Sequence, residues 1–157
     1  MSEREERLAS LGFQLEGAPA PAANYVPIVC HNGLAYLSGA LPTDGSRGLL
    51  YKGPAYTSSD LATAQKAAEL CAVNLLRVFR AELGSLERLG RVIRLGVYVN
   101  CRGDFSDAHL VANGASDLLA KVLGEPGRHT RSAICVPNLP LGAQVEVDAI
   151  FAIEPGS

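Results

Sequence analysis

Apolar residues recur at intervals of three and four between residues 61 and 79, which is the spacing of one face of an α-helix. The preceding run, Ser58-Ser59-Asp60, supplies side chains of the kind that cap helix N-termini, and Gly84 is typical of a helix end. The sequence therefore predicts a long amphipathic helix between these two signals. Its apolar face consists of Leu61, Ala64, Ala68, Cys71, Leu75, Val78 and Phe79.

Strand-like patterns flank this helix. Two apolar runs, 26–30 and 34–42, lie on either side of Asn32-Gly33, which is the strongest short signal for a β-hairpin. Residues 91–100 alternate between apolar and polar positions, as in a strand that is covered on one side. The apolar positions of this second segment are Ile93, Leu95, Val97 and Val99.

Weaker patterns fill the remaining segments. Residues 2–12 predict a short surface helix, with Ser2 as N-cap and Gly12 as stop. Residues 43–57 are polar and glycine-rich, so we expect a long loop there with at most a brief edge strand at Leu49-Leu50-Tyr51. A second helical pattern over residues 110–122 ends at Gly124 and is interrupted by the weak helix formers Asn113-Gly114.

The last segment, residues 130–151, reads as two strands joined by a proline-rich turn, and we expect them to form a hairpin. With the crossover through the long helix, the element order predicts an α+β domain, a mixed β-sheet with helices packed on one face. Residues on both sides of the final strand are apolar, including Val147 and Ile150. The uncovered face therefore needs a partner, and self-association would supply it.

Composition indicates a single domain and disfavours nucleic-acid and membrane partners. A chain of 157 residues fits one domain, residues 1–157, with residues 1–20 as an N-terminal extension. The formal net charge of -2 gives no basic surface for phosphates, so we expect no nucleic-acid partner. No apolar run is long enough to span a bilayer, and the charged N-terminus does not resemble a signal peptide, so we expect no membrane partner and a cytoplasmic location.

The cysteines and histidines indicate no metal. Cys30, Cys71, Cys101 and Cys135 are scattered without a CxxC pair, and we expect them to be reduced, mostly buried side chains. No pair of the three histidines has metal-ligand spacing, and His31 and His109 are expected to be structural or exposed.

Charged residues in the two final strands are the first candidates for chemistry. Glu146 and Asp148 have equal parity and therefore point to one face, while Arg131 begins the other strand. The guanidinium of Arg131 is a planar fork that suits capture of a small carboxylate. Spacing alone favours a different interpretation, a cross-strand surface ion pair worth less than about 1 kcal/mol.

Sequence motifs along most of the chain favour the carboxylate-binding role of Arg131 over the surface ion pair. The run RSAICVPNLPLGAQVEVDAIF resembles the C-terminal signature of the YjgF/RidA family of reactive-intermediate deaminases, an Arg-Ser strand, a Leu-Pro turn and a V-E-[IV]-[ED]-A-I strand. YLSGALP is similar to the family's [TL]-S-G-x-[IL]-P motif, ANYVPIV to its upstream segment with a tyrosine, and VIRLGVYVNCRGDF to its central strand and Asp-Phe turn. The matches run from Pro21 to Ile153 in the family's order.

The resemblance implies a chorismate-mutase-like α+β fold, assembled as a homotrimer in which the sheets form a central barrel with ligand clefts between subunits. It places the family's carboxylate-binding arginine at Arg131, its cleft glutamate at Glu146, its strand serine at Ser38 and its tyrosine at Tyr25. Asn113 is a looser match to a helix asparagine in the substrate-binding set.

The activity that this resemblance implies is hydrolysis of enamines and 2-imino acids to 2-oxo acids and ammonia, without a metal or organic cofactor. Arg131 would bind the substrate carboxylate, and Glu146 would polarise the attacking water. An alternative is a non-catalytic trimer that binds a small 2-oxo or amino acid through the same Arg131. Ribonuclease activity is disfavoured by the acidic charge balance, and chorismate mutase activity would require cationic groups that the sequence does not place.

Two departures from the family pattern affect the expected cleft. The segment from residue 106 to residue 130 is longer than in the archetypal members, and Ala133 stands where a cysteine commonly follows the Arg-Ser motif. His129, beside the arginine, is a further candidate for a polar contact, although a solvated loop histidine is the simpler expectation.

Overall fold

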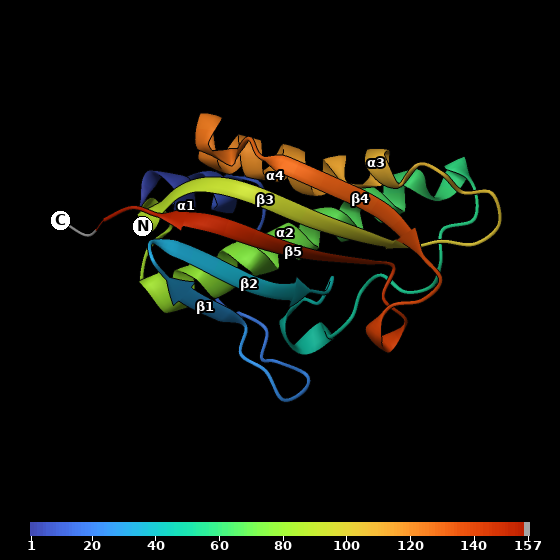
Figure 1. The fold of residues 1–157 in the computed structure, drawn as a ribbon, viewed down its shortest axis with the longest axis horizontal. Coiled ribbons are helices and arrows are strands. Elements are labelled where there is room, and N and C mark those ends of the chain that lie inside the picture. Colours follow the sequence, from blue (N-terminus) through green and yellow to red (C-terminus); the bar gives the residue numbers. More distant parts are fainter. Residues whose placement is uncertain (156–157) are drawn as a thin grey trace.

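The computed structural model describes residues 1–155 and contains, in that range, one five-stranded sheet with the order β1-β2-β5-β3-β4. Figure 1 shows the helices together on one side of this sheet. The expected α+β architecture, a mixed sheet with helices on one face, is confirmed. The strands are β1 (Ile28–His31), β2 (Leu34–Ala40), β3 (Leu89–Asn100), β4 (Thr130–Val136) and β5 (Val145–Ile153), and the α-helices are α1 (Glu3–Ser10), α2 (Leu61–Leu83), α3 (Ala108–Val111) and α4 (Asn113–Leu123).

The first hairpin forms where the sequence predicts it. β1 and β2 pair antiparallel up to the His31–Leu34 pair, and the two residues between them turn the chain. Asn32 and Gly33 have φ angles of 50° and 74°. Asparagine and glycine tolerate this left-handed region better than other residues do, which is why this dipeptide predicts the turn.

The expected final hairpin is wrong. β4 does not pair with β5, because β3 lies between them, parallel to β4 and antiparallel to β5. The chain reaches β4 from β3 through α3 and α4, and such a helical crossover returns the chain parallel to the strand it left. The turn after β4 then carries the chain past the end of β3, so that β5 enters the sheet between β2 and β3.

Side chains on one face of the sheet pack against α2 and α4 to form the core. Leu95, Val97 and Val99 lie in this core as the alternation predicts, but Ile93 is 39% exposed and Val92 is buried in its place. The cause is a register shift between β3 and β5 at residues 92–94. This shift changes by one residue which side chains of β3 face the core. α2 ends at Gly84, which has a φ of 86°.

The second predicted helix is two helices, and Gly114 explains how the second one packs. α3 ends before Ala112, and α4 begins at Asn113. A Cβ atom at Gly114 would lie 2.0 Å from the backbone oxygen of Gln65 in α2. Glycine has a low helix propensity, and the sequence therefore predicted an interruption here. In the structure, the missing side chain of Gly114 allows α4 to approach α2 closely.

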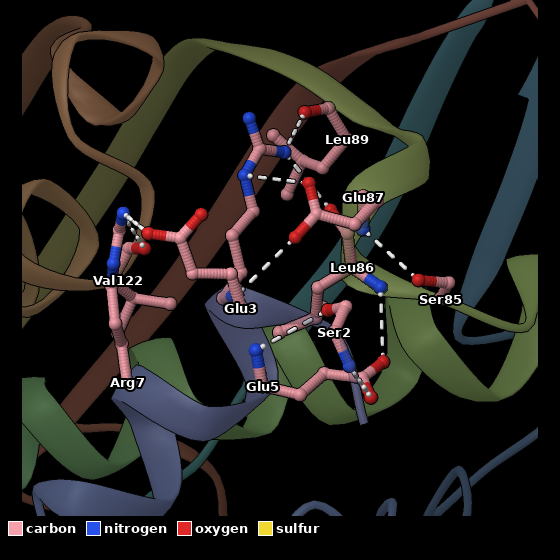
Figure 2. Close-up of polar contacts among 10 residues, drawn as sticks. Ser2, Glu3, Glu5, Arg7, Ser85, Leu86, Glu87, Leu89 and Val122 are labelled. Atoms are coloured by element: carbon pink, nitrogen blue, oxygen red, sulfur yellow. Dashed lines mark hydrogen bonds and ion pairs between the residues drawn. The ribbon is translucent and has the colours of Figure 1, made fainter.

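The predicted N-terminal surface helix forms, and hydrogen bonds fix it to the body of the protein (Figure 2). Ser2 caps α1 in a reciprocal capping box with Glu5. The Glu5 side chain is buried and accepts a hydrogen bond of 3.3 Å from the backbone N–H of Leu86, while Arg7 donates one of 3.2 Å to the carbonyl oxygen of Val122. α1 therefore connects the end of α2 to the end of α4.

The expectation of four reduced cysteines is also wrong. Cys101 and Cys135 form a disulfide, with their Cα atoms 5.5 Å apart. The parallel pairing of β3 and β4 brings the two C-terminal strand ends together, although 34 positions separate the cysteines in the sequence. Cys71 is a buried free thiol and Cys30 an exposed one.

The sheet face away from the helices is uncovered. It exposes large apolar side chains, among them Val29, Tyr36 and Ile134. The expected long loop over residues 43–57 forms; it contains none of the strands β1–β5, and Leu49 shares only an isolated bridge with Thr43. Within residues 1–155, no helix combines the length and the apolar character needed to cross a membrane.

Replacing Gly114 with alanine is expected to destabilise the fold. An alanine in an unhindered helix position would stabilise it by about 1 kcal/mol relative to glycine. The contact with the Gln65 carbonyl group instead predicts an overpacking cost of about 1–3 kcal/mol. Urea denaturation of wild type and G114A measures the difference, with the exposed α4 substitution Lys121→Ala as control. An unfolding free energy for G114A above that of the wild type would contradict this account of the α2–α4 contact.

Candidate functional site

Three hydrogen bonds hold the Arg131 side chain against α3 and α4. Its Nη1 donates to Oδ1 of Asn113 and to Oγ of Ser116, each at 3.0 Å, and its Nη2 donates to the backbone oxygen of His109 at 2.9 Å. Leu95, which pairs with Arg131 across β3 and β4, points into the core, so Arg131 lies on the helix-covered face of the sheet. Arg131 and Asn113, both predicted for the site, are thus in direct contact.

All three acceptors around Arg131 are uncharged. Among the described residues 1–155, no carboxylate lies within ion-pair distance of this guanidinium. Of its five N–H groups, three are used by these bonds, which leaves Nε–H and one N–H of Nη2. A half-buried arginine with a fixed orientation, two remaining donors and an uncompensated charge is suited to bind an anion.

A cavity of about 300 Å³ opens beside Arg131. His129 and Ser116 line it together with Arg131, and His129 Nε2 lies 2.9 Å from Ser116 Oγ. Burial lowers the pKa of His129, and the charge of Arg131 lowers it further, while the hydrogen bond to the Gly127 carbonyl oxygen acts in the opposite direction. His129 is therefore part of a network behind the arginine rather than a solvated loop residue.

Glu146 lies on the opposite face of the sheet. Alternate residues of β5, from Val145 to Phe151, are buried against the helices, so Glu146 and Asp148 point the other way. Partial burial raises the pKa of the Glu146 carboxyl group, and the neighbouring Asp148 raises it further. The Asp148 carboxylate itself accepts a hydrogen bond of 3.1 Å from the hydroxyl group of Tyr98.

Gly39 makes room for the Glu146 carboxylate. A Cβ atom at Gly39 would lie 2.4 Å from Oε1 of Glu146, so any larger residue would displace the side chain. Gly39 also lines a second cavity, of about 230 Å³, together with Tyr25 and Ser38. Ser38 donates its hydroxyl proton to the carbonyl oxygen of Val26 at 2.7 Å. Three predicted site residues therefore gather around Gly39.

The predicted residues thus form two groups within one chain. Arg131 and Asn113 belong to the helix-covered side, whereas Tyr25, Ser38 and Glu146 belong to the region around the second cavity. The ion-pair interpretation of Arg131 and Glu146 is wrong, since β3 separates their strands and the two side chains point to opposite faces. The cavity beside Arg131 and the second cavity share no lining residue.

Sequence reasoning missed Ser116 and the backbone oxygen of His109 as partners of Arg131. Ser116 follows Asn113 by three positions, the spacing that places two helical side chains on one face, and this signal was available. The carbonyl oxygen of His109 carries no sequence signal, because any residue supplies one. Across residues 1–155, no three side chains of His, Cys, Asp or Glu lie close enough to hold a metal ion.

The chain matches a known protein family over nearly its whole length. The family profile described as "YjgF/chorismate mutase-like, putative endoribonuclease" covers residues 5–153. The chain belongs to the YjgF/RidA family. The chorismate-mutase-like fold that the sequence motifs imply is confirmed.

Individual proteins are also similar to this chain over most of their length. The chain is 44% identical to protein TCP17 of Trypanosoma cruzi over 147 residues, which is 93% of this chain and 91% of TCP17. Its structure is similar to that of Atu1372 from Agrobacterium tumefaciens, a protein of unknown function, with a TM-score of 0.89 and 47% identity over 96% of this chain and 92% of the other. RidA from an Antarctic Psychrobacter species gives a TM-score of 0.63 at 26% identity, over 87% and 94% of the two chains.

The raised pKa of Glu146 predicts a pH-dependent effect of Glu146→Gln on stability. A carboxyl group whose pKa is higher in the folded than in the unfolded state stabilises the fold at low pH, and this contribution is lost as the pH rises through the folded-state pKa. The uncharged amide of the E146Q side chain does not ionise, so the variant does not lose this stability as the pH rises. We therefore expect E146Q to have a higher Tm than wild type at about pH 7.5 and no such advantage at about pH 3.5.

Thermal denaturation at both pH values makes the comparison. Glu125→Gln is the control, because the Glu125 carboxylate is largely exposed and paired with Arg91. Equal melting temperatures for wild type and E146Q at the higher pH would show that Glu146 is not held in an unfavourable environment.

Proposed function

We propose that this protein is a homotrimeric deaminase that hydrolyses small reactive 2-imino or enamine acids to 2-oxo acids and ammonia, in clefts between subunits and without a cofactor. YjgF/RidA membership supports a small-molecule-binding or deaminase role. The proposed unit is one domain, residues 1–157, with residues 1–20 as an extension. The observation that carries the proposal is the fixed guanidinium of Arg131, whose three partners are all neutral.

The positions of the two groups support a cleft that is shared by two subunits. Arg131 and Glu146 are directed to opposite faces of one sheet, so a single chain does not bring them to the same small ligand. A second copy whose Glu146 region faces the Arg131 region of the first would do so. The exposed apolar side chains on the uncovered sheet face, such as Tyr36 and Ile134, favour such an assembly.

In the proposed reaction, the substrate carboxylate binds to the two remaining donors of Arg131, which orients the imine carbon. Tyr25 and Ser38 line the other side of the cleft. Water attacks the carbon, Glu146 accepts a proton from that water, and the C=N double bond becomes a C–N single bond. Glu146 then returns this proton to nitrogen, which gives a carbinolamine. The hydroxyl proton of the carbinolamine is next transferred to nitrogen, by way of Glu146, as the C–O bond becomes a double bond and the C–N bond breaks, so that the products are a 2-oxo acid and ammonia.

The environment of Glu146 suits this proton transfer. Efficient general acid–base catalysis requires a group whose pKa lies near the working pH, and both burial and Asp148 move the pKa of Glu146 upward from its usual acidic range. Binding alone would need no carboxylate close to an anionic ligand. The alternative function, a trimer that only binds a small 2-oxo or amino acid, therefore differs from the proposed one in its dependence on Glu146.

Activity is tested with a dehydratase that generates 2-aminoacrylate or 2-aminocrotonate while 2-oxo acid formation is followed. Arg131→Ala should reduce kcat/KM by about 10–100-fold, from loss of a charged hydrogen bond. Glu146→Gln should reduce kcat by about 100-fold or more, from loss of the proton acceptor. Glu125→Gln, an exposed carboxylate, is the matched control. Wild-type protein that binds pyruvate but does not accelerate 2-oxo acid formation would establish the alternative.

Mixing inactive variants tests the shared cleft. If each cleft takes Arg131 from one subunit and Glu146 from its neighbour, then R131A and E146Q unfolded and refolded together at equal concentration should restore activity to about a quarter of the clefts. The two variants refolded separately and then combined are the control. Failure to recover activity in mixed trimers, or a gel-filtration mass of a single chain, would contradict the intersubunit site.

A further inference from the structure

The hydrogen bonds behind Arg131 form a chain with a defined direction. The carbonyl oxygen of Gly127 only accepts, so His129 Nδ1, 2.6 Å away, carries a proton and donates it. In the neutral imidazole, Nε2 is then an acceptor, and the hydroxyl group of Ser116 at 2.9 Å donates to it. The oxygen of Ser116 in turn accepts from Nη1 of Arg131 at 3.0 Å. Ser116 and His129 thus each donate one hydrogen bond and accept one within this chain.

We propose that Ser116 and His129 are positioning residues for Arg131, and that binding of an anion at Arg131 is coupled to uptake of a proton by His129. This inference rests on the proposed function, since the anion is taken to be a small 2-oxo or imino acid. It extends that function by naming residues that lie outside the substrate contacts and by giving the site a pH dependence.

Two physical effects produce the coupling. The positive charge of Arg131 opposes a second positive charge on His129, and a carboxylate bound to the arginine would offset that charge. Protonation of His129 also reverses the bond to Ser116, because Nε2–H then donates to Oγ. The hydroxyl proton of Ser116 is thereby released toward the cavity that Ser116 and Arg131 share, where an anion oxygen can accept it.

Charged residues of both signs line the two cavities beside His129. Asp117 of α4 lines the same cavity, and Arg128 lies on the segment before β4. Arg91 of β3 lines the neighbouring cavity beside His129, and it is paired at 2.9 Å with Glu125. Among these groups, Arg131 is the one joined to His129 through a shared hydrogen-bond partner, and an anion that binds it changes its effective charge.

Thermodynamic linkage between proton binding and anion binding gives the direction of the pH effect on anion affinity. If an anion raises the pKa of His129, then protonated His129 must bind the anion more tightly by the same factor. We therefore expect the affinity for pyruvate to increase by about threefold to tenfold between pH 8 and pH 5, the range in which histidine titrates. Pyruvate is a suitable probe because its carboxylate remains ionised over this range.

Calorimetric titration with pyruvate is made in the Glu146→Gln background, since the raised pKa of Glu146 would add its own pH dependence. His129→Gln can keep both hydrogen bonds but does not titrate, so it should bind as tightly as its parent at pH 8 and show no increase at pH 5. Ser116→Ala should weaken binding at every pH by about twofold to tenfold, from loss of the hydrogen bond that Ser116 accepts from Arg131. His31→Gln, at the exposed β1–β2 turn, should keep the full pH dependence.

Nitrogen NMR of the imidazoles separates this inference from the proposed function. In the ligand-free protein we expect the Nδ1–H tautomer of His129, and pyruvate should raise the pKa of His129. The Nε2–H tautomer of His129, or an unchanged pH dependence of pyruvate affinity in His129→Gln, would overturn this inference. Neither result would contradict the binding of a carboxylate by Arg131. If pyruvate does not bind at any pH, Arg131 is not a carboxylate-binding residue, and both proposals are wrong.

Discussion

The close approach of α4 to α2 at Gly114 is the constraint on which the candidate site depends. The glycine brings the first turn of α4 against the Gln65 carbonyl group, and this same turn carries Asn113 and Ser116. Those two side chains accept the hydrogen bonds from Nη1 that fix Arg131. A larger residue at position 114 would move the turn away from α2 and the acceptors with it. Packing in the core therefore determines the direction of a guanidinium at the sheet edge.

A second constraint is the alternation of side chains along the strands. Because successive residues of a strand point to opposite faces, and because β3 separates β4 from β5, Arg131 and Glu146 are directed away from each other. Each group carries a feature that is unfavourable by itself: a guanidinium without a counter-ion on one side, and a carboxyl group with a raised pKa on the other. In the proposed intersubunit cleft, the guanidinium of one subunit would lie near the carboxyl group of the next, and their opposite charges would offset both features.

The sequence by itself determined the elements that local chemistry specifies. The apolar stripe with Gly84 at its end predicted α2, and Asn32-Gly33 predicted the first hairpin, since each signal acts within a few residues. The motifs around Tyr25, Ser38, Arg131 and Glu146 identified the family because they are read directly along the chain. Their assignment as site residues remains a prediction from that resemblance.

Only the tertiary structure decided which strands are neighbours and which face each candidate occupies. The turn after β4 has the composition of a hairpin turn, yet β5 pairs with β3, because pairing depends on contacts between segments that are distant in sequence. The Cys101–Cys135 disulfide and the shift that buries Val92 instead of Ile93 follow from those same contacts. The backbone acceptor at His109 leaves no trace in the sequence, since every residue carries the same carbonyl group.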